Sequence, residues 1–540
     1  MSGAVIRPGL PWEGAAAPAA PGAVPWLGLA AVLLGTFLST LNGQLSTFGL
    51  ADIRGAIHAG FDEGAWITTA QAIAQVMVAP LAVWMGSVYG PRRVLIYAAL
   101  AFAAISLLKP AASDLAEILA LQFAGGLASG FFIPLTIGFV LKSLPPRYWT
   151  YGIAIYALNL ETSLNISASF EGFYVDQLSW RWIFWQSVPI ALAMAGCLYL
   201  GTNREAPITS KPALDRFGML TCGSGLALIY AALDQGNRVD WFNAAQTWAL
   251  FGAGGIILIS FVVHELRSQH PFLDLSVVVT PPLPAAMSLI ALLRLTILST
   301  AFLIPTYLGG VRGFRALETG QTLIWIAAPQ LLVCLAAGYV LRRVDTRMVA
   351  CGGFLLICVA CLIDSHGLTP LWGSDQFLHS QLLQAVGQSF ALTGIVFFAV
   401  QNLRPAAALS LGAVMQIARL MGGEAGQAFI ATFIRVRSQI ASNLIGLHVN
   451  AGDSLVQQRL QIYAAVTARA GDPQSGPERG AAVLGAVVRS AATTQAVMDA
   501  FLTIGLFAAL AMLVMVAQRA PPLNPAAPRG LFSPAKETPR

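Results

Sequence analysis

The stretch LALQFAGGLASGFFIPL, residues 119–135, contains no Asp, Glu, Lys or Arg in its seventeen residues. It lies within a longer apolar block at 116–141. About 20 apolar residues are enough to cross ~30 Å of hydrocarbon as a helix. Its glycines and alanines are typical of membrane helices that approach one another closely. The block therefore predicts a transmembrane helix that packs against other helices.

Similar blocks recur along the whole chain. Of its 540 residues 56% are hydrophobic and only 10% are charged, whereas a soluble protein carries about a quarter charged residues. We therefore predict an all-α polytopic membrane protein with fourteen spans. They lie near 26–50, 64–86, 94–112, 116–141, 150–173, 182–201, 217–234, 246–265, 284–310, 320–341, 348–366, 376–402, 406–434 and 497–518.

The distribution of Lys and Arg predicts how the chain is oriented. Loops after even-numbered spans carry twice as many of these residues as the short loops after odd-numbered spans, where Arg54 and Lys109 are counted. Because cytoplasmic loops are enriched in positive charge, we predict that both tails are cytoplasmic. The predicted divisions are tails at 1–25 and 519–540, an N-terminal six-helix half at 26–201, an extra helix pair with linkers at 202–275, and a C-terminal six-helix half at 276–518.

One connection, 435–496, is much longer than the others. Its sequence has helical periodicity on both sides of the turn GDPQSGPERG, residues 471–480, which predicts two amphipathic helices. A loop of this length in a compact fold is usually functional or disordered. We predict an ordered external cap or docking surface.

Several functional classes lack support in the sequence. The net charge of +6 is not gathered into a compact basic cluster, so no nucleic-acid partner is expected. The six cysteines lie in apolar blocks and are interpreted as packing residues. No phosphate-binding glycine loop and no metal-ligand spacing occur. We expect no enzymatic activity, no metal and no cofactor.

Short segments in the right order carry a resemblance to a known family. YGPRRV, residues 89–94, resembles the loop between spans two and three of the major facilitator superfamily, with Gly90 in the turn and Arg92 and Arg93 placed to meet helix C-termini or acids. LSTLNGQLSTFGLADI, residues 38–53, resembles the first-span signature of its fourteen-span drug:proton antiporters. Further similar segments lie at 61–71, 119–135, 179–190, 233–243, 264–275 and 419–429.

The resemblance covers nearly the whole chain and is closest to EmrB-like exporters of the EmrB/QacA (DHA2) type. It implies the major facilitator fold, with two six-helix halves and two extra central helices. It also implies proton-driven export of small amphipathic drugs across the bacterial inner membrane. A periplasmic adaptor of the HlyD/EmrA type and an outer-membrane channel would be partners, with 435–496 as the contact.

The chain departs from this family where proton coupling is usually found. Asn42 stands at the first-span Asp position, and Gln122 begins a fourth-span segment that lacks the membrane arginine. The fifth-span antiporter motif aligns with SLNISASFEG, residues 163–172, without its Gly-Pro. Two alternatives therefore stay open: a specific exporter of an endogenous metabolite with altered coupling, or a non-transporting receptor or assembly protein that retains the fold.

Charged residues inside predicted spans are the main site candidates. An ionised side chain at the bilayer centre costs at least ~2.5–3.5 kcal/mol. Glu161 lies about 15 Å into its span, near the midplane, and Glu171 lies about 15 Å further on. We predict that Glu161 handles protons or substrate, since competition between a proton and a cationic substrate at one carboxylate would couple their movements; a buried structural hydrogen bond or ion pair is the alternative. Glu171 can snorkel or hydrate near the outer surface, so for this acid a structural or vestibule role is as well supported as a role in coupling.

The other candidates are Arg294, Arg419 and Glu424. Pairing of Arg294 with Glu161 or with Glu424 would satisfy both charges, and the sequence leaves the choice open. Uncharged polar residues predict a hydrated central path, with interhelical hydrogen bonding as the alternative. The cavity candidates are Asn42, Gln44, Gln71, Gln75, Gln122, Asn159, Asn165, Gln381, Gln384 and Gln388.

Overall fold

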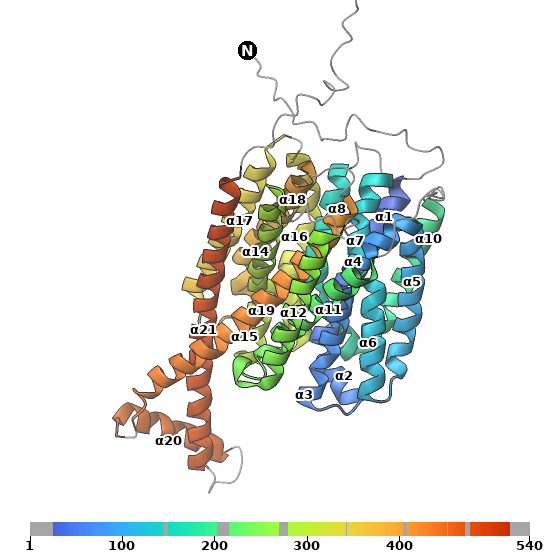
Figure 1. The fold of residues 1–540 in the computed structure, drawn as a ribbon. Helices are drawn as coiled ribbons and strands as arrows, with labels where there is room; N and C mark the ends of the chain where they lie inside the picture. Colours follow the sequence, from blue (N-terminus) through green and yellow to red (C-terminus); the bar gives the residue numbers. More distant parts are fainter. Residues whose placement is uncertain are drawn as a thin grey trace, which may run out of the picture.

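Helices lying side by side form a single bundle (Figure 1). The computed structural model describes residues 25–143, 149–201, 215–268, 279–341, 343–402, 408–450, 452–469 and 476–518. Within these ranges all regular structure is helical. The helices before residue 201 form one side of the bundle and those after residue 279 form the other. Helices α11 and α12 lie across the junction in Figure 1.

The first half follows the predicted spans closely. Span four is divided between α6 and α7, and span six between α9 and α10. The helices are α1 (Pro25–Phe48), α2 (Leu50–Ala56), α3 (Phe61–Gly64), α4 (Trp66–Tyr89), α5 (Pro91–Leu108), α6 (Leu115–Ser129), α7 (Phe132–Ser143), α8 (Trp149–Phe173), α9 (Trp182–Trp185) and α10 (Ser187–Gly201).

The extra pair and the second half follow the prediction equally well. Span nine is divided between α14 and α15 by a five-residue π segment, Ser299–Leu303. The helices are α11 (Arg216–Gly236), α12 (Ala245–Arg267), α14 (Leu283–Leu298), α15 (Ile304–Gly310), α16 (Ala316–Val340), α17 (Thr346–Gly367), α18 (Leu378–Gln401), α19 (Ala408–Gly446), α20 (Ser454–Arg469) and α21 (Gly476–Val516).

Length and composition make this a multi-pass membrane protein. Twelve helical segments of the described chain are long and apolar enough to cross a membrane. Helices α8 and α19 are not among the twelve, and they coincide with predicted spans five and thirteen. They are also the helices that carry Glu161, Glu171, Arg419 and Glu424. The predicted count of fourteen fits the structure, with the two most polar spans inside the bundle.

In each half an arginine near the start of one helix donates hydrogen bonds to carbonyls at or after the end of the last helix. Gly90 adopts φ 83° at the end of α4, which allows the tight turn into α5. Arg92 then donates to the carbonyls of Leu198 and Tyr199 (3.2 and 3.0 Å) near the end of α10. In the second half Arg347, at the start of α17, donates to the carbonyl of Gln518 (2.8 Å) after α21. The last carbonyls of a helix have no partner within it, so both arginines satisfy groups that would otherwise need water.

Arg347 also forms an ion pair with Asp345 (2.8 Å), just before α17. Hydrogen bonding to the Arg347 guanidinium holds the pKa of the Asp345 carboxyl below its usual range.

The two halves touch at both ends of the bundle. Near the end of α8 a Cβ on Gly172 would lie 2.4 Å from the backbone nitrogen of Leu317 in α16. Near the start of α19 a Cβ on Gly412 would lie 2.3 Å from the carbonyl oxygen of Pro134 in α7. Only glycine permits such approach of two backbones. The halves are therefore closed against each other on both sides of the centre.

The region 435–496 differs from its prediction in one respect. Helix α20 is the first of the two predicted helices, but the second is continuous with span fourteen as α21, a single helix of 41 residues. At 1.5 Å per residue α21 is about 60 Å long, twice the thickness of the hydrocarbon. Its first part, together with α20 and the end of α19, projects from the bundle (Figure 1).

Candidate functional site

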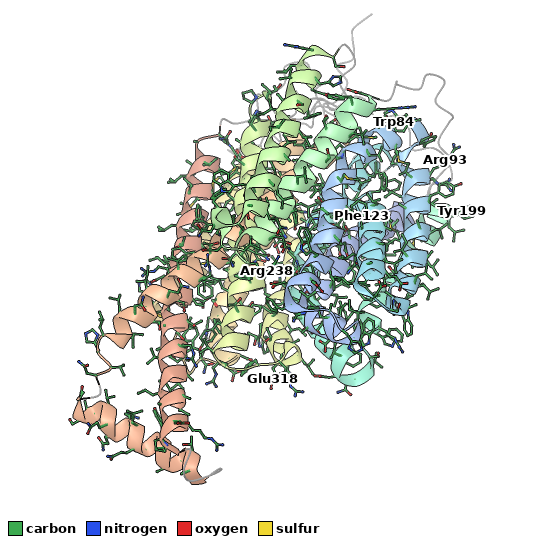
Figure 2. All side chains as sticks on the ribbon, turned by 60° about the horizontal axis from the view of Figure 1, so that its bottom comes forward. Trp84, Arg93, Phe123, Tyr199, Arg238 and Glu318 are labelled. Carbon is green, nitrogen blue, oxygen red and sulfur yellow. The ribbon has the colours of Figure 1, made fainter. Side chains whose placement is uncertain are left out.

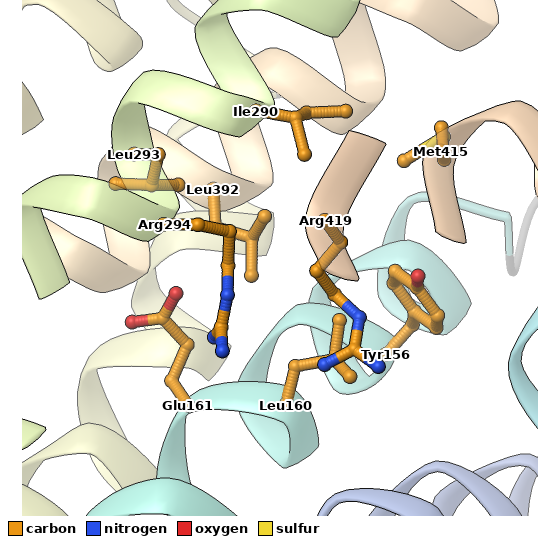
Figure 3. A pocket seen from close by; sticks show the side chains of 9 residues that line it. All are labelled: Tyr156, Leu160, Glu161, Ile290, Leu293, Arg294, Leu392, Met415 and Arg419. Carbon is orange, nitrogen blue, oxygen red and sulfur yellow. The ribbon is translucent and has the colours of Figure 1, made fainter. Parts of the chain in front are cut away.

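A small closed cavity lies where the two halves meet. Helix α8 contributes Tyr156 and Glu161, α14 contributes Arg294 and α19 contributes Arg419 (Figure 3). The rest of the lining is apolar: Leu160, Ile290, Leu293, Leu392 and Met415. The cavity measures about 10 Å³, about the volume that one water molecule requires. Three charged side chains from both halves thus share an enclosed site.

These charges are poorly compensated in the closed conformation. Glu161 is 1% exposed, and neither of its carboxyl oxygens has a hydrogen-bond partner. Nε of Arg294 is also buried without a partner, although Figure 3 shows Arg294 beside Glu161. Arg419, 6% exposed, donates to Gln416 Oε1 (3.0 Å). Among the described residues neither arginine forms an ion pair.

Glu424 lies in a different environment, although it is on the same helix as Arg419. It is buried against Tyr230 and Asp234 of α11, the first helix of the extra pair. Asp234 accepts a hydrogen bond from Thr69 of α4. Of the two pairings left open by the sequence, Arg294 therefore faces Glu161, and Glu424 joins α19 to α11 and α4.

Glu171 is separate from the central cavity and does not match its prediction. A Cβ on Gly49, the residue between α1 and α2, would lie 3.5 Å from Glu171 Cγ, so this acid packs at the far end of α8. It was expected to hydrate near the surface, but it is only 2% exposed and its Oε2 has no hydrogen-bond partner. The cause is the packing of α8 against α1, which covers this end of the helix.

None of the ten cavity candidates lines the cavity around Glu161. Several instead form hydrogen bonds between helices. Asn165 of α8 donates to Gln330 Oε1 (3.2 Å), and Gln330 of α16 donates to Gln388 Oε1 (3.2 Å). Gln388 in turn donates to Gln384 Oε1 (3.2 Å), and Gln384 to Ser299 Oγ (3.0 Å). This chain of amides links the two halves next to the charged site.

The remaining candidates are divided between the halves. In the first half Asn42 donates to Gln71 Oε1 (3.0 Å), and Gln75 to Ser129 Oγ (3.0 Å). Gln44 is partly buried. Asn159 Nδ2 and both polar atoms of Gln381 are buried without a partner.

Arg93 is exposed, whereas its neighbour Arg92 is buried against the end of α10. Figure 2 shows Arg93 and Tyr199 at the surface of the first half. Arg93 lies at the edge of a hollow of about 700 Å³ between α4, α5 and α6, whose other lining residues are mostly apolar.

Sequence reasoning missed four polar residues, of which three are buried and one is half-buried. Lys109 was counted in an external loop, yet it is 0% exposed. Asp234 and Asp364 stand near the ends of predicted spans; Asp364 is 1% exposed, whereas Asp234 is half-buried and accepts a hydrogen bond from Thr69. Gln330 is a single amide within an apolar block. Each of the four has a polar partner on another helix, so no local pattern pointed to them.

The fold and the buried charges define a membrane transporter rather than an enzyme. The sequence profile of the Major Facilitator Superfamily matches residues 32–427, and the chain belongs to this superfamily. Two solved structures share the fold. The human organic anion transporter MFSD10 has a TM-score of 0.52 at 15% identity and covers 91% of this chain and 97% of its own. The proton:xylose symporter XylE has a TM-score of 0.54 at 11% identity and covers 91% and 95%.

Multidrug exporters are among its relatives. The probable multidrug resistance protein EmrY of Escherichia coli is 26% identical over 63% of this chain and just under two thirds (66%) of its own length. The multidrug export protein EmrB of Haemophilus influenzae is 23% identical over 79% of this chain and 84% of its own. The predicted superfamily and the predicted similarity to EmrB-type exporters are confirmed.

Proposed function

We propose that this protein is a secondary active exporter of the bacterial inner membrane, driven by the proton gradient, with Glu161 as its central proton site. The observation that carries the proposal is the lack of any hydrogen-bond partner for the Glu161 carboxyl in an enclosed cavity between the two halves. Midplane sites between related halves are where alternating-access carriers bind their substrates.

The environment of Glu161 supplies a rule for coupling. An ionised carboxylate that is enclosed without a partner costs several kcal/mol, so the halves close around this residue far more readily when it is protonated. A substrate that donates a hydrogen bond to the carboxylate satisfies it in another way. The halves then close when Glu161 carries a proton or when substrate is bound to it, but not when the carboxylate is ionised and the site is empty. Because each closure carries either a proton or a substrate molecule, the two move across the membrane in exchange for each other.

The lining indicates the kind of substrate. Five apolar side chains lie beside one carboxylate and two guanidiniums. The closed cavity of about 10 Å³ is too small for a substrate, but the same lining suits an amphipathic molecule with a polar head once the halves separate. Because two arginines face one acid, a simple cation is repelled. A neutral or weakly acidic head that donates to Glu161 and accepts from Arg294 or Arg419 fits better. This replaces the expectation of a cationic competitor.

We further propose that the projecting helices bind a periplasmic adaptor of the HlyD/EmrA type, which connects to an outer-membrane channel. This requires the orientation expected from the Lys and Arg distribution, with both tails cytoplasmic. The projection exposes apolar side chains on three helices: Leu444, Leu447, Leu455, Ile462, Val466 and Val487. Leu455→Glu with Ile462→Glu should abolish co-purification with the adaptor, whereas Arg459→Glu on the same helix serves as the matched control.

Flux in proteoliposomes tests the transport proposal without the adaptor. Vesicles loaded with an amphipathic dye should move it against its gradient when a pH difference is imposed, and a protonophore should stop this movement. Transport that is indifferent to the pH difference would overturn the proton coupling. Absence of any flux with normal adaptor binding would favour a receptor or assembly role. Uptake restricted to one metabolite would favour a specific exporter.

A further inference from the structure

Lys109 is a buried amine that the central site does not explain. It follows α5 directly, in a short 3-10 turn (Lys109–Ala111), and is 0% exposed. Its Nζ donates to Gln122 Oε1 of α6 at 2.6 Å. The rings of Phe102 and Phe184 lie with their centroids 5.7 and 5.2 Å from Nζ.

No acid of the described chain pairs with this amine. The elements against it are α5, α6 and α9. The acids nearest in sequence, Asp114 and Glu117 at the start of α6, are exposed. They are engaged in the helix cap, where Asp114 accepts from the Glu117 backbone N–H (2.8 Å) and Glu117 from that of Ser113 (2.8 Å). Helix α9 (Trp182–Trp185) carries no ionisable side chain.

The amine is connected to the interior by neutral groups alone. Gln122, which accepts from Lys109, donates to Ser46 Oγ of α1 (3.5 Å), and Ser46 donates to the carbonyl of Asn42 (3.0 Å). Asn42 continues to Gln71 of α4. Every one of these groups serves a neutral amine as well as an ammonium, since each is an amide, hydroxyl or carbonyl. The two rings favour the ammonium, whereas burial without an acid favours the neutral amine, so no fixed charge holds the lysine in one form.

We propose that Lys109 is a second proton-binding group of the transport cycle, in the N-terminal half, in addition to Glu161. Lysine is the cation that loses its proton most readily when buried, whereas arginine keeps its charge. An ionisable group inside a membrane without a counter-ion is a functional candidate by default. In the closed conformation the amine is sealed, so its proton exchanges only when the surrounding helices open. This inference rests on the proposed proton-driven transport.

Two variants with fixed charge test the proposal. Lys109→Arg keeps a permanent cation and Lys109→Met removes it. The proton-to-substrate ratio is measured in proteoliposomes as the pH difference that just balances a known substrate gradient. We expect both variants to move one proton fewer per substrate than the wild type. Substrate exchange without a gradient should continue in both, and Arg267→Gln, at the exposed end of α12, should keep the wild-type ratio.

If Lys109 is only a structural cation, Lys109→Arg should keep the wild-type proton-to-substrate ratio. If Lys109 only fills space, Lys109→Met should keep that ratio. Either result overturns the inference. If the wild type itself shows no proton-driven transport, the proposed function fails instead.

A second measurement does not depend on stable variants. The chain has four lysines, Lys109, Lys142, Lys211 and Lys536, so lysine labelled with ¹³C at Cε gives few NMR signals. At one fixed pH, saturation with substrate should shift the Lys109 signal toward the other charge state and leave the other three in place. A Lys109 signal that is the same in free and saturated protein contradicts the proposal.

Discussion

The two halves share a plan but carry opposite buried charges. Arg92 and Arg347 open the corresponding helices α5 and α17, and each donates to carbonyls at the end of the last helix of its half. Seventeen residues after each arginine stands a buried ionisable residue, Lys109 in the first half and Asp364 in the second. The two arginines therefore have the same structural role in both halves, whereas the buried ionisable residue at the corresponding position differs in charge between them.

At the centre the signs are reversed. The first half supplies the acid, Glu161, and the second supplies both arginines, Arg294 and Arg419. Protonation of Glu161 therefore changes the charge that faces the two arginines across the junction.

The largest effect is expected from removing the central arginine of the second half. Arg294→Gln removes the cation that faces Glu161 (Figure 3), so the ionised carboxylate becomes harder to keep at the centre during the cycle, with an expected cost of about 3 kcal/mol. Proton-driven flux should fall about 100-fold. Flux in proteoliposomes measures this, and Arg267→Gln, at the exposed end of α12, is the control. Near-normal flux in Arg294→Gln would contradict the idea that transport depends on an acid in one half facing arginines in the other.

Propping the halves apart at one end should have the next largest effect. Gly172→Val forces α8 away from α16, and Gly412→Val forces α19 away from α7. We expect each variant to slow exchange about tenfold, since one closed state becomes costly by more than 1 kcal/mol. Spin-label distances should lengthen at the altered end and not at the other. Equal lengthening at both ends would show that the two contacts are not independent.

A smaller effect is expected from the buried acid of the second half. One carboxyl oxygen of Asp364 has no partner, so the neutral form is the cheaper one to enclose. Because Asn imitates that form, Asp364→Asn should change proton-driven flux by less than about threefold. Lys109→Met provides the comparison from the first half. A changed proton-to-substrate ratio in Asp364→Asn would show that the second half, like the first, has a proton-binding group at this position.

The smallest effect concerns the two arginine caps and their pH dependence. Arg92→Gln and Arg347→Gln should each lower thermal stability in detergent, by about 1.5–3 kcal/mol per lost charge-assisted hydrogen bond at most. Only Arg347 also holds an acid, Asp345, whose pKa is lowered in the folded protein. The contribution of ionised Asp345 to the free energy of unfolding is present above the unfolded pKa of about 3.9 and is lost as the pH falls through the folded pKa.

The stability difference between wild type and Arg347→Gln should therefore shrink in acid, and that between wild type and Arg92→Gln should not. Melting temperatures over a pH series measure both, and a parallel decline would contradict the role of Asp345.

The sequence predicted the helices well because span length and apolar composition are local properties. All fourteen predicted spans correspond to helices, and Gly90 occupies the positive-φ turn expected of it. The candidate site was predicted only in part. Glu161, Arg294 and Arg419 were named from the cost of charge in a membrane, but their meeting at one cavity depends on how α8, α14 and α19 pack.

The errors have the same origin. Lys109 and Glu171 were placed by their distance along a span, and both were expected at the hydrated ends. Neighbouring helices cover them instead, so depth along one helix did not give exposure. The continuity of α21 was missed because its external part is polar enough to suggest a separate helix.

The most direct test of the account compares Glu161→Gln with the wild type in two assays on the same vesicles. Gln imitates a permanently protonated acid, so the account predicts that substrate movement driven by a pH difference is lost. Substrate exchange at equal pH should stay within about tenfold of the wild type. Proton-driven transport at the wild-type rate in Glu161→Gln would contradict the central claim that this carboxyl couples protons to export.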